Sequence, residues 1–117
     1  MQNNPFNNLP IINKKDAINI LSKPLGEVKF LSDYYKAVFH LASFPCEESE
    51  TALLDFIKSD YQKLEFNIAR RKAIEVLALF DCKKAIPTIA DYLQSDDSYL
   101  VESSLWSLGK LKCNNDD

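Results

Sequence analysis

The sequence predicts an all-α fold built from stacked helical hairpins, and three observations support that prediction. Apolar residues recur at helical spacing, the chain repeats itself at an interval of about 36 residues, and only 2 Gly and 5 Pro are present. So few turn-forming residues argue against an all-β meander with many tight turns. With 117 residues, the chain has room for one domain with one continuous core.

The repeat is clearest at the ends of three expected helices. Residues 41–46, 77–82 and 108–113 each read leucine, a small residue, any residue, phenylalanine or leucine, any residue, cysteine. These segments start 36 and then 31 residues apart. A second set, residues 17–21, 53–57 and 89–93, repeats at 36 residues with Asn or Asp at its centre. Two helix types therefore alternate, and we predict a HEAT-like superhelix of about three repeats.

Apolar stripes and spacing place the helices along the chain. We expect helices near residues 14–22, 33–44, 48–59, 66–80, 84–95 and 98–111. Stripes at i, i+4 and i+7 identify the second and the fourth: Ala37, Leu41 and Phe44, then Ala73, Leu77 and Phe80.

Prolines and acidic residues mark the helix ends. Pro45 ends the second helix, because proline lacks the N–H that a helix interior needs. Three glutamates in residues 47–50 favour the positive end of the third helix dipole. Pro87 falls in the first turn of the fifth helix, where its missing N–H has no partner to lose. Residues 96–98 supply capping oxygens for the sixth helix.

The repeat also sets the expected domain plan. Residues 1–13 form a flexible N-terminal arm, residues 14–112 a single HEAT-repeat domain, and residues 113–117 a C-terminal tail. Five additional residues within 61–67 either lengthen the fourth helix or form a protruding loop. The last helix spreads its apolar residues more widely than one neighbour can cover. We therefore expect further HEAT repeats or a second polypeptide, such as a second subunit, to cover it.

Composition and charge exclude several classes of function. A net charge of −3 argues against nucleic-acid binding, which normally requires a basic surface. No apolar run approaches the ~20 residues of a membrane span. Residues 1–5 lack the basic and apolar regions of a signal peptide, so we expect a cytoplasmic protein.

Cysteine and histidine usage predicts no metal site. The three cysteines are an odd number without a C-x-x-C pair, which fits neither a disulfide framework nor a set of zinc ligands. Their identical place at the ends of three helices indicates that each fills a tight turn between helices. His40 stands alone and is interpreted as an ordinary polar position.

The segment 95–109 resembles one family in particular. The run Tyr99-Leu100-Val101-Glu102, followed by Trp106-Ser107-Leu108-Gly109, resembles the E/F-type phycobilin lyases of cyanobacteria. These HEAT-repeat proteins attach open-chain tetrapyrroles to cysteines of antenna phycobiliproteins. Residues 68–97 also look similar to that family, although they fit many HEAT proteins.

The resemblance implies a phycobilin lyase or a subunit of one. A thiolate of the acceptor phycobiliprotein subunit would add to the ethylidene side chain of the bilin and form a thioether. The bilin, phycoerythrobilin or phycocyanobilin, would be a substrate, with no bound prosthetic group and no metal. The alternative is a non-catalytic HEAT-repeat adaptor that binds another protein in phycobilisome assembly or turnover. The short chain and the absence of a self-sufficient catalytic set favour this alternative.

The resemblance also implies roles for particular residues. Asp97 and Glu102, with Asp96 beside them, would face the pyrrole nitrogens as catalytic carboxyl groups. Tyr99 and Trp106 would form an aromatic wall for the bilin, because positions 99, 102 and 106 share one helix face. Arg70 and Arg71 would bind the propionates or the acidic surface of an antenna protein.

Each of these roles has a structural alternative. Asp97 can cap its helix, Glu102 can be a solvated charge, and Trp106 can belong to the core. Consecutive residues of a helix point about 100° apart. At most two of Arg70, Arg71 and Lys72 can therefore meet one ligand, and a solvated face is the alternative for all three.

Overall fold

The computed structural model describes residues 13–24, 27–28, 30, 32–59 and 64–113, and its fold is all-α. Six α-helices lie in this part of the chain: α1 (Lys14–Leu21), α2 (Ser32–Leu41), α3 (Glu47–Ile57), α4 (Leu64–Leu79), α5 (Ile86–Asp91) and α6 (Ser98–Cys113). None of them is long and apolar enough to cross a membrane. Apart from residues 13 and 113, the expected arm at 1–13 and tail at 113–117 lie outside the described residues.

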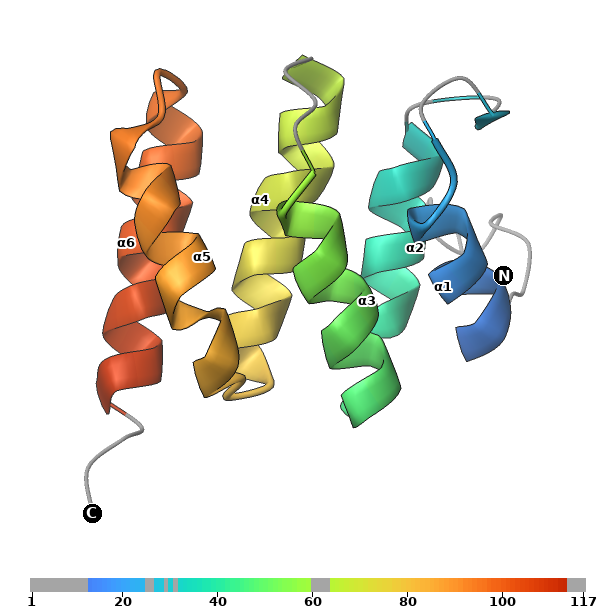
Figure 1. Cartoon of the computed structure of the whole chain (residues 1–117), viewed down its shortest axis with the longest axis horizontal. Helices are drawn as coiled ribbons and strands as arrows, with labels where there is room; N and C mark the ends of the chain where they lie inside the picture. Colours follow the sequence, from blue (N-terminus) through green and yellow to red (C-terminus); the bar gives the residue numbers. More distant parts are fainter. Residues whose placement is uncertain (1–12, 25–26, 29, 31, 60–63, 114–117) are drawn as a thin grey trace, which may run out of the picture.

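The helices form three antiparallel pairs that lie side by side (Figure 1). Helices α1, α3 and α5 make the front layer of this view, and α2, α4 and α6 make the layer behind it. Each helix of the rear layer packs on the helix that precedes it, and α4 packs on both α2 and α6. The two helix types that alternate in the sequence therefore occupy different layers of the fold.

Helix α2 ends three residues before the predicted position, at Leu41. Proline disfavours helical geometry in the residue before it, so Pro45 acts on Phe44 and the chain leaves the helix earlier. The amide of Phe44 donates to the carbonyl of Leu41 at 2.8 Å in the turn that follows. Phe44 is 37% exposed, so the prediction that it continues the buried stripe is wrong.

Helix α4 ends in a Schellman motif. Asp81 has a φ of 58°, in the left-handed region. The amide of Cys82 donates to the carbonyl of Leu77 at 3.0 Å, and the amide of Asp81 donates to that of Ala78 at 3.0 Å. These bonds satisfy carbonyls that the end of a helix leaves without partners. At its other end α4 begins at Leu64, so part of the additional sequence in 61–67 lengthens the helix, while residues 60–63 lie outside the described residues.

The segment predicted as one helix at 84–95 has three parts. The 3-10 turns η3 (Lys83–Ala85) and η4 (Tyr92–Gln94) flank the short helix α5. Pro87 lies in the first turn of α5, as predicted. The tighter turns use bonds between residues three apart, Ala85 to Cys82 and Ser95 to Tyr92, both at 3.1 Å.

The core lies between the two layers. Ala37 and Leu41 of α2 are fully buried, as are Ala73 and Leu77 of α4, which confirms the predicted stripes within the helices. An aromatic cluster joins α2, α3 and α4: the ring centroids of Tyr34, Phe56 and Phe66 lie 4.6–5.4 Å apart. Such ring pairs contribute about 0.5–1.5 kcal/mol each beyond the area that they bury.

Two of the repeated cysteines occupy equivalent positions. Cys46 directly precedes α3 and Cys82 directly precedes η3, and both are free thiols. Cys82 is buried, and burial raises the pKa of its thiol. Cys46 is half-buried, and a hydrogen bond with the hydroxyl of Ser49, at 3.5 Å, lowers the pKa of its thiol. The tight, buried place predicted for these cysteines is therefore observed at Cys82 and only in part at Cys46.

Candidate functional site

Helix α4 directs Arg70 into the interior. This side chain is 3% exposed. Its guanidinium donates to the carbonyl of Ser59 at 2.7 Å and to Oδ1 of Asn67 at 2.5 Å. It also lies 4.8 Å from the ring centroid of Phe66 and 5.3 Å from that of Tyr92. Arg70 thus joins the end of α3 to η4, and these contacts are structural.

Asp97 lies on the same side of α4, where it caps α6. Its Oδ1 accepts from the amides of Tyr99 at 3.0 Å and Leu100 at 3.3 Å, and its Oδ2 accepts from Asn67 at 3.2 Å. A side-chain oxygen in this position satisfies donors that the first turn of a helix leaves free. Arg70, Asp96 and Asp97 all line a polar pocket of about 1020 Å³ between α3, α4, η4 and the start of α6.

Tyr99, Glu102 and Trp106 lie on another side of α6. Tyr99 is 63% exposed and Trp106 is 52% exposed, and Glu102 is exposed as well. The alternative that Trp106 belongs to the core is therefore wrong. The apolar positions of α6 divide in the same way, since Leu108 is buried and Leu105 is 58% exposed.

Two cations complete this surface. The guanidinium carbon of Arg71 lies 5.2 Å from the ring centroid of Tyr99, and the amine of Lys110 lies 5.9 Å from that of Trp106. Both distances fall within the range of a cation–π contact. We call the surface formed by Arg71, Tyr99, Glu102, Trp106 and Lys110 the α4–α6 face. It offers two exposed rings, two positive charges and one carboxylate.

A groove of about 450 Å³ adjoins the α4–α6 face, between α2 and α4. Arg71 lines both, and Tyr35 and Lys72 supply further walls of the groove. Glu75 belongs to the groove as well, and its carboxylate accepts from the hydroxyl of Ser103 at 2.9 Å, which fixes α6 against α4.

The structure thus separates the site residues predicted from the sequence into two groups. Arg71, Tyr99, Glu102 and Trp106 share one exposed surface, whereas Arg70 and Asp97 lie at the polar pocket and hold helices together. The sequence analysis missed Lys110, although its place four residues after Trp106 signals the shared helix face. Tyr35 gave no such signal, because only packing of α2 on α4 brings it near. Within the described residues, no three His, Cys, Asp or Glu side chains are grouped to hold a metal ion.

Comparison with curated proteins finds two relatives of this chain. One relative is 42% identical over 87 residues and another is 32% identical over 100 residues. The chain is homologous to both. The resemblance that residues 95–109 indicate is therefore confirmed.

The first relative is the bilin biosynthesis protein CpeY of Synechococcus sp. (strain WH8020), and the match covers 72% of this chain and 20% of CpeY. The second is the uncharacterized phycocyanin operon protein Y of Pseudanabaena tenuis (strain PCC 7409), with 86% of this chain and 24% of that protein covered. The chain thus spans a fifth to a quarter of the length of these relatives. No protein-family profile and no solved structure matches it.

Proposed function

We propose that this chain assists the covalent attachment of an open-chain tetrapyrrole to a cysteine of a phycobiliprotein, as a phycobilin lyase or a part of one. The observation that carries the proposal is the exposure of Tyr99 and Trp106, at 63% and 52%, on the helix that bears the family resemblance. Large aromatic side chains at such exposure favour a ligand that stacks on them. The homology to CpeY, a bilin biosynthesis protein, favours a bilin as that ligand.

In this proposal the bilin lies along the α4–α6 face. At 1.5 Å of rise per residue, Tyr99 and Trp106 are about 10 Å apart along the helix axis, so they would lie under different rings of an extended tetrapyrrole. Arg71 and Lys110 would bind its two propionates, because charge-assisted hydrogen bonds to carboxylates are among the strongest available. Glu102 lies between the two rings in the sequence and would face the pyrrole nitrogens.

The reaction needs no redox partner and no leaving group. The thiol of the acceptor protein adds across the ethylidene double bond, so that sulfur bonds to carbon and the proton of the thiol ends on the tetrapyrrole. This chain would contribute mainly by positioning the bilin for that attack. Glu102 would add acid catalysis worth about 10²–10⁴-fold. Asp97 and Arg70 would act as positioning residues, since they fix the start of α6 and the packing of α4.

We also propose that the three helix pairs are HEAT-like repeats of a longer solenoid. The interval of about 36 residues and the two layers of alternating helices support this proposal. Further repeats or a second lyase subunit would cover α6, where Leu105 is 58% exposed. The acceptor would be a phycobiliprotein subunit in the cytoplasm.

The proposal is tested with the purified chain, phycoerythrobilin or phycocyanobilin, and candidate acceptor subunits. We expect a shift in bilin absorbance on binding and an adduct formed faster than the spontaneous background. Trp106→Ala and Glu102→Gln should weaken binding and attachment respectively, whereas Phe44→Ala, which removes an exposed ring elsewhere, should not. Absence of both binding and catalysed attachment would overturn the proposal. Binding of the acceptor alone would instead support the adaptor function.

A further inference from the structure

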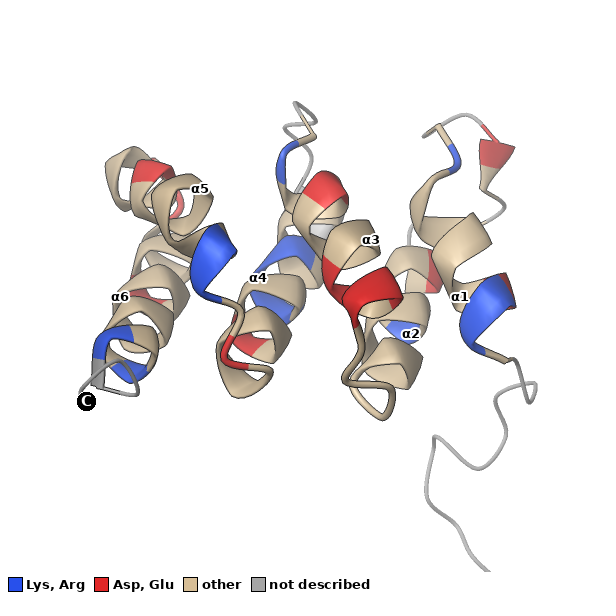
Figure 2. Ribbon diagram, turned by 60° about the horizontal axis from the view of Figure 1, so that its bottom comes forward, with Lys and Arg blue, Asp and Glu red and all other residues tan. Residues whose placement is uncertain are grey.

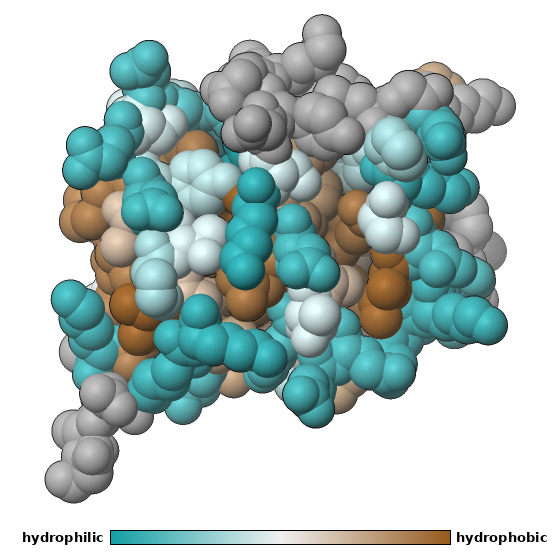
Figure 3. Space-filling model, in the orientation of Figure 1, coloured by the Kyte–Doolittle hydropathy of each residue, from teal (hydrophilic) through white to brown (hydrophobic). Residues whose placement is uncertain are grey.

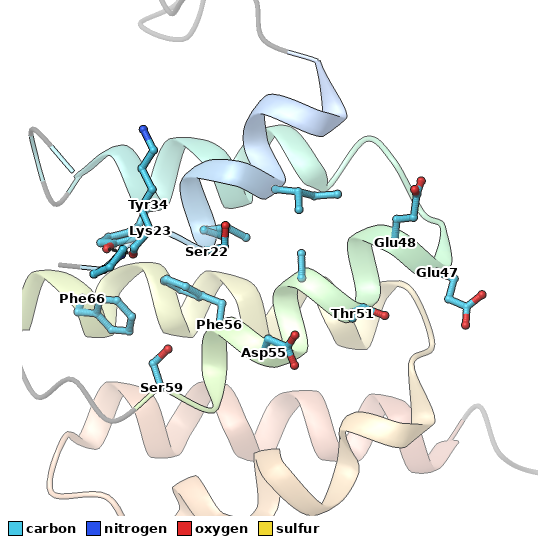
Figure 4. Close-up of a pocket in the computed structure, with 14 residues that line it drawn as sticks. Ser22, Lys23, Tyr34, Glu47, Glu48, Thr51, Asp55, Phe56, Ser59 and Phe66 are labelled. Carbon is cyan, nitrogen blue, oxygen red and sulfur yellow. Dashed lines mark hydrogen bonds between the residues drawn. The ribbon is translucent and has the colours of Figure 1, made fainter. Parts of the chain in front are cut away.

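A further cavity lies in the front layer, between α1 and α3 (Figure 4). Its volume is about 750 Å³, large enough for several side chains. Ile18 and Leu21 of α1 line one side and Ala52 of α3 lines the other. The buried rings of Tyr34 and Phe56 line its deep end. We call this cavity the α1–α3 pocket, and none of its lining residues belongs to the α4–α6 face.

The deep end of the pocket is held rigidly. The hydroxyl of Tyr34 donates to the carbonyl of Lys23 at 2.7 Å, which ties α2 to the end of α1. The ring of Tyr34 also packs at 5.4 Å on Phe56 of α3. The space-filling view shows hydrophobic surface between hydrophilic ridges on the face that carries α1 and α3 (Figure 3). The pocket is therefore a preformed apolar recess and does not need a ligand to open it.

The rim of the pocket is acidic. Helix α3 carries a run of carboxylates (Figure 2), of which Glu47, Glu48 and Asp55 line the pocket. Glu48 forms an ion pair with Lys14, but no ion pair involves Glu47 or Asp55 in the described part of the chain. The cation that lines the pocket, Lys23, directs its amine away from the recess (Figure 4). An apolar recess thus lies beside two carboxylates that form no ion pair with any described residue.

We infer that the α1–α3 pocket docks a segment of a partner protein that carries a large apolar side chain next to a lysine or arginine. The apolar side chain would fill the recess, and the basic group would meet Asp55 at the rim. Glu47 lies about 12 Å further along the axis of α3 and would meet a second basic group of the segment. A bilin fits this pocket poorly, because its two propionates would face carboxylates. The recess lies between two helices, which is the geometry in which amphipathic helices bind grooves.

Fluorescein-labelled peptides test this inference by fluorescence anisotropy. The probe is an amphipathic helical peptide of leucine and lysine, and its matched control has glutamate in place of every lysine. We expect the lysine peptide to bind, with an affinity that falls as salt rises, and the glutamate peptide to bind at least tenfold more weakly. No binding of the lysine peptide, or equal binding of both peptides, overturns the inference.

Three variants locate the binding site of the peptide. Ala52→Trp fills the recess and should weaken binding about tenfold, and Asp55→Asn should weaken it about 3- to 5-fold, as expected for an exposed charge pair. Asp91→Asn removes an exposed carboxylate on α5, away from the pocket, and should leave binding unchanged. Asp55→Asn keeps the test valid if circular dichroism shows that Ala52→Trp does not fold. Equal effects of Asp55→Asn and Asp91→Asn would show nonspecific attraction and overturn the inference.

The peptide assay contains no bilin, so its outcome is independent of the proposed lyase function. Bilin binding is measured on the same variants to identify the other possible occupant. We expect Ala52→Trp to bind bilin like the parent chain. Loss of bilin binding in Ala52→Trp, with binding retained in Trp106→Ala, would assign the pocket to the bilin and overturn docking of a protein segment there.

Discussion

Arg70 and Arg71 are neighbours in the sequence but have opposite surroundings in the fold. Arg70 is 3% exposed, lies between two aromatic rings and hydrogen-bonds to the end of α3. Arg71 lies over the exposed ring of Tyr99 and lines the groove between α2 and α4. Successive helix positions point about 100° apart, so one basic run serves two regions of the molecule. The interior uses its charge to join helices, and in the proposed function the surface presents its charge to a ligand.

The largest expected effect comes from removing the interior charge. Arg70→Ala deletes charge-assisted hydrogen bonds to Ser59 and Asn67 and leaves the part-buried carbonyl of Ser59 without this donor. We expect the free energy of unfolding to fall by about 3 kcal/mol, measured by urea denaturation. Arg71→Ala is the matched control, and its loss should stay within about 1 kcal/mol. Similar losses in the two variants would remove the distinction between the regions.

The exposed region should respond in binding and not in stability. Trp106→Ala removes a ring that is 52% exposed, so we expect the unfolding free energy to change by less than about 0.5 kcal/mol. In the proposed function, the same variant should weaken bilin binding about tenfold, through lost stacking and burial. Absorbance titration and thermal denaturation of the same samples separate the two effects. A large loss of stability would assign Trp106 to packing.

Helix positions and the buried stripes followed from the sequence because they depend on local spacing. Ala37, Leu41, Ala73 and Leu77 are buried as their periodicity indicates, since a helix can bury only one side against its neighbours. Phe44 departs from the pattern because Pro45 disfavours helical geometry at Phe44, so the helix ends before the last position of the stripe. Residues such as proline thus determine where a helix ends, and the spacing of apolar residues determines which side of the helix is buried.

Only part of the candidate site could be predicted from the sequence. Tyr99, Glu102 and Trp106 share one helix, so spacing alone places them on one face. Spacing alone does not show which of Arg70 and Arg71 faces the interior. That depends on how α4 is rotated about its axis, which its packing against α3 and α6 decides. The acidic rim of the α1–α3 pocket also depends on tertiary packing, because residues of α1, α2 and α3 form it together.

Asp97 is half-buried at the polar pocket and should show a smaller effect. It caps α6 with bonds of 3.0 and 3.3 Å to the amides of Tyr99 and Leu100. Asp97→Ala should therefore lower the unfolding free energy by about 1 kcal/mol, whereas Asp97→Asn, which retains a capping oxygen, should lower it less. If Asp97 also acts on the bilin, Asp97→Asn will slow attachment at unchanged stability. Denaturation and attachment rates of both variants test this.

The smallest effect extends the contrast between interior and surface to the repeated cysteines. The hydrogen bond from Ser49 lowers the pKa of Cys46, and burial raises the pKa of Cys82. Since the thiolate is the reactive form, Cys46 should react with iodoacetamide at a lower pH than Cys82. Mass spectrometry of the labelled chain across a pH series measures both rates.

Ser49→Ala provides the control for this prediction, because it removes the donor that stabilises the Cys46 thiolate and leaves Cys82 in place. The reaction of Cys46 should then move to higher pH, because the thiolate loses a hydrogen bond that favours the charged form. An unchanged Cys46 profile in Ser49→Ala would show that the Ser49 hydroxyl does not set the difference between the two cysteines. Equal rates at the two cysteines would show that their shared place in the repeat, before α3 and η3, outweighs their different burial.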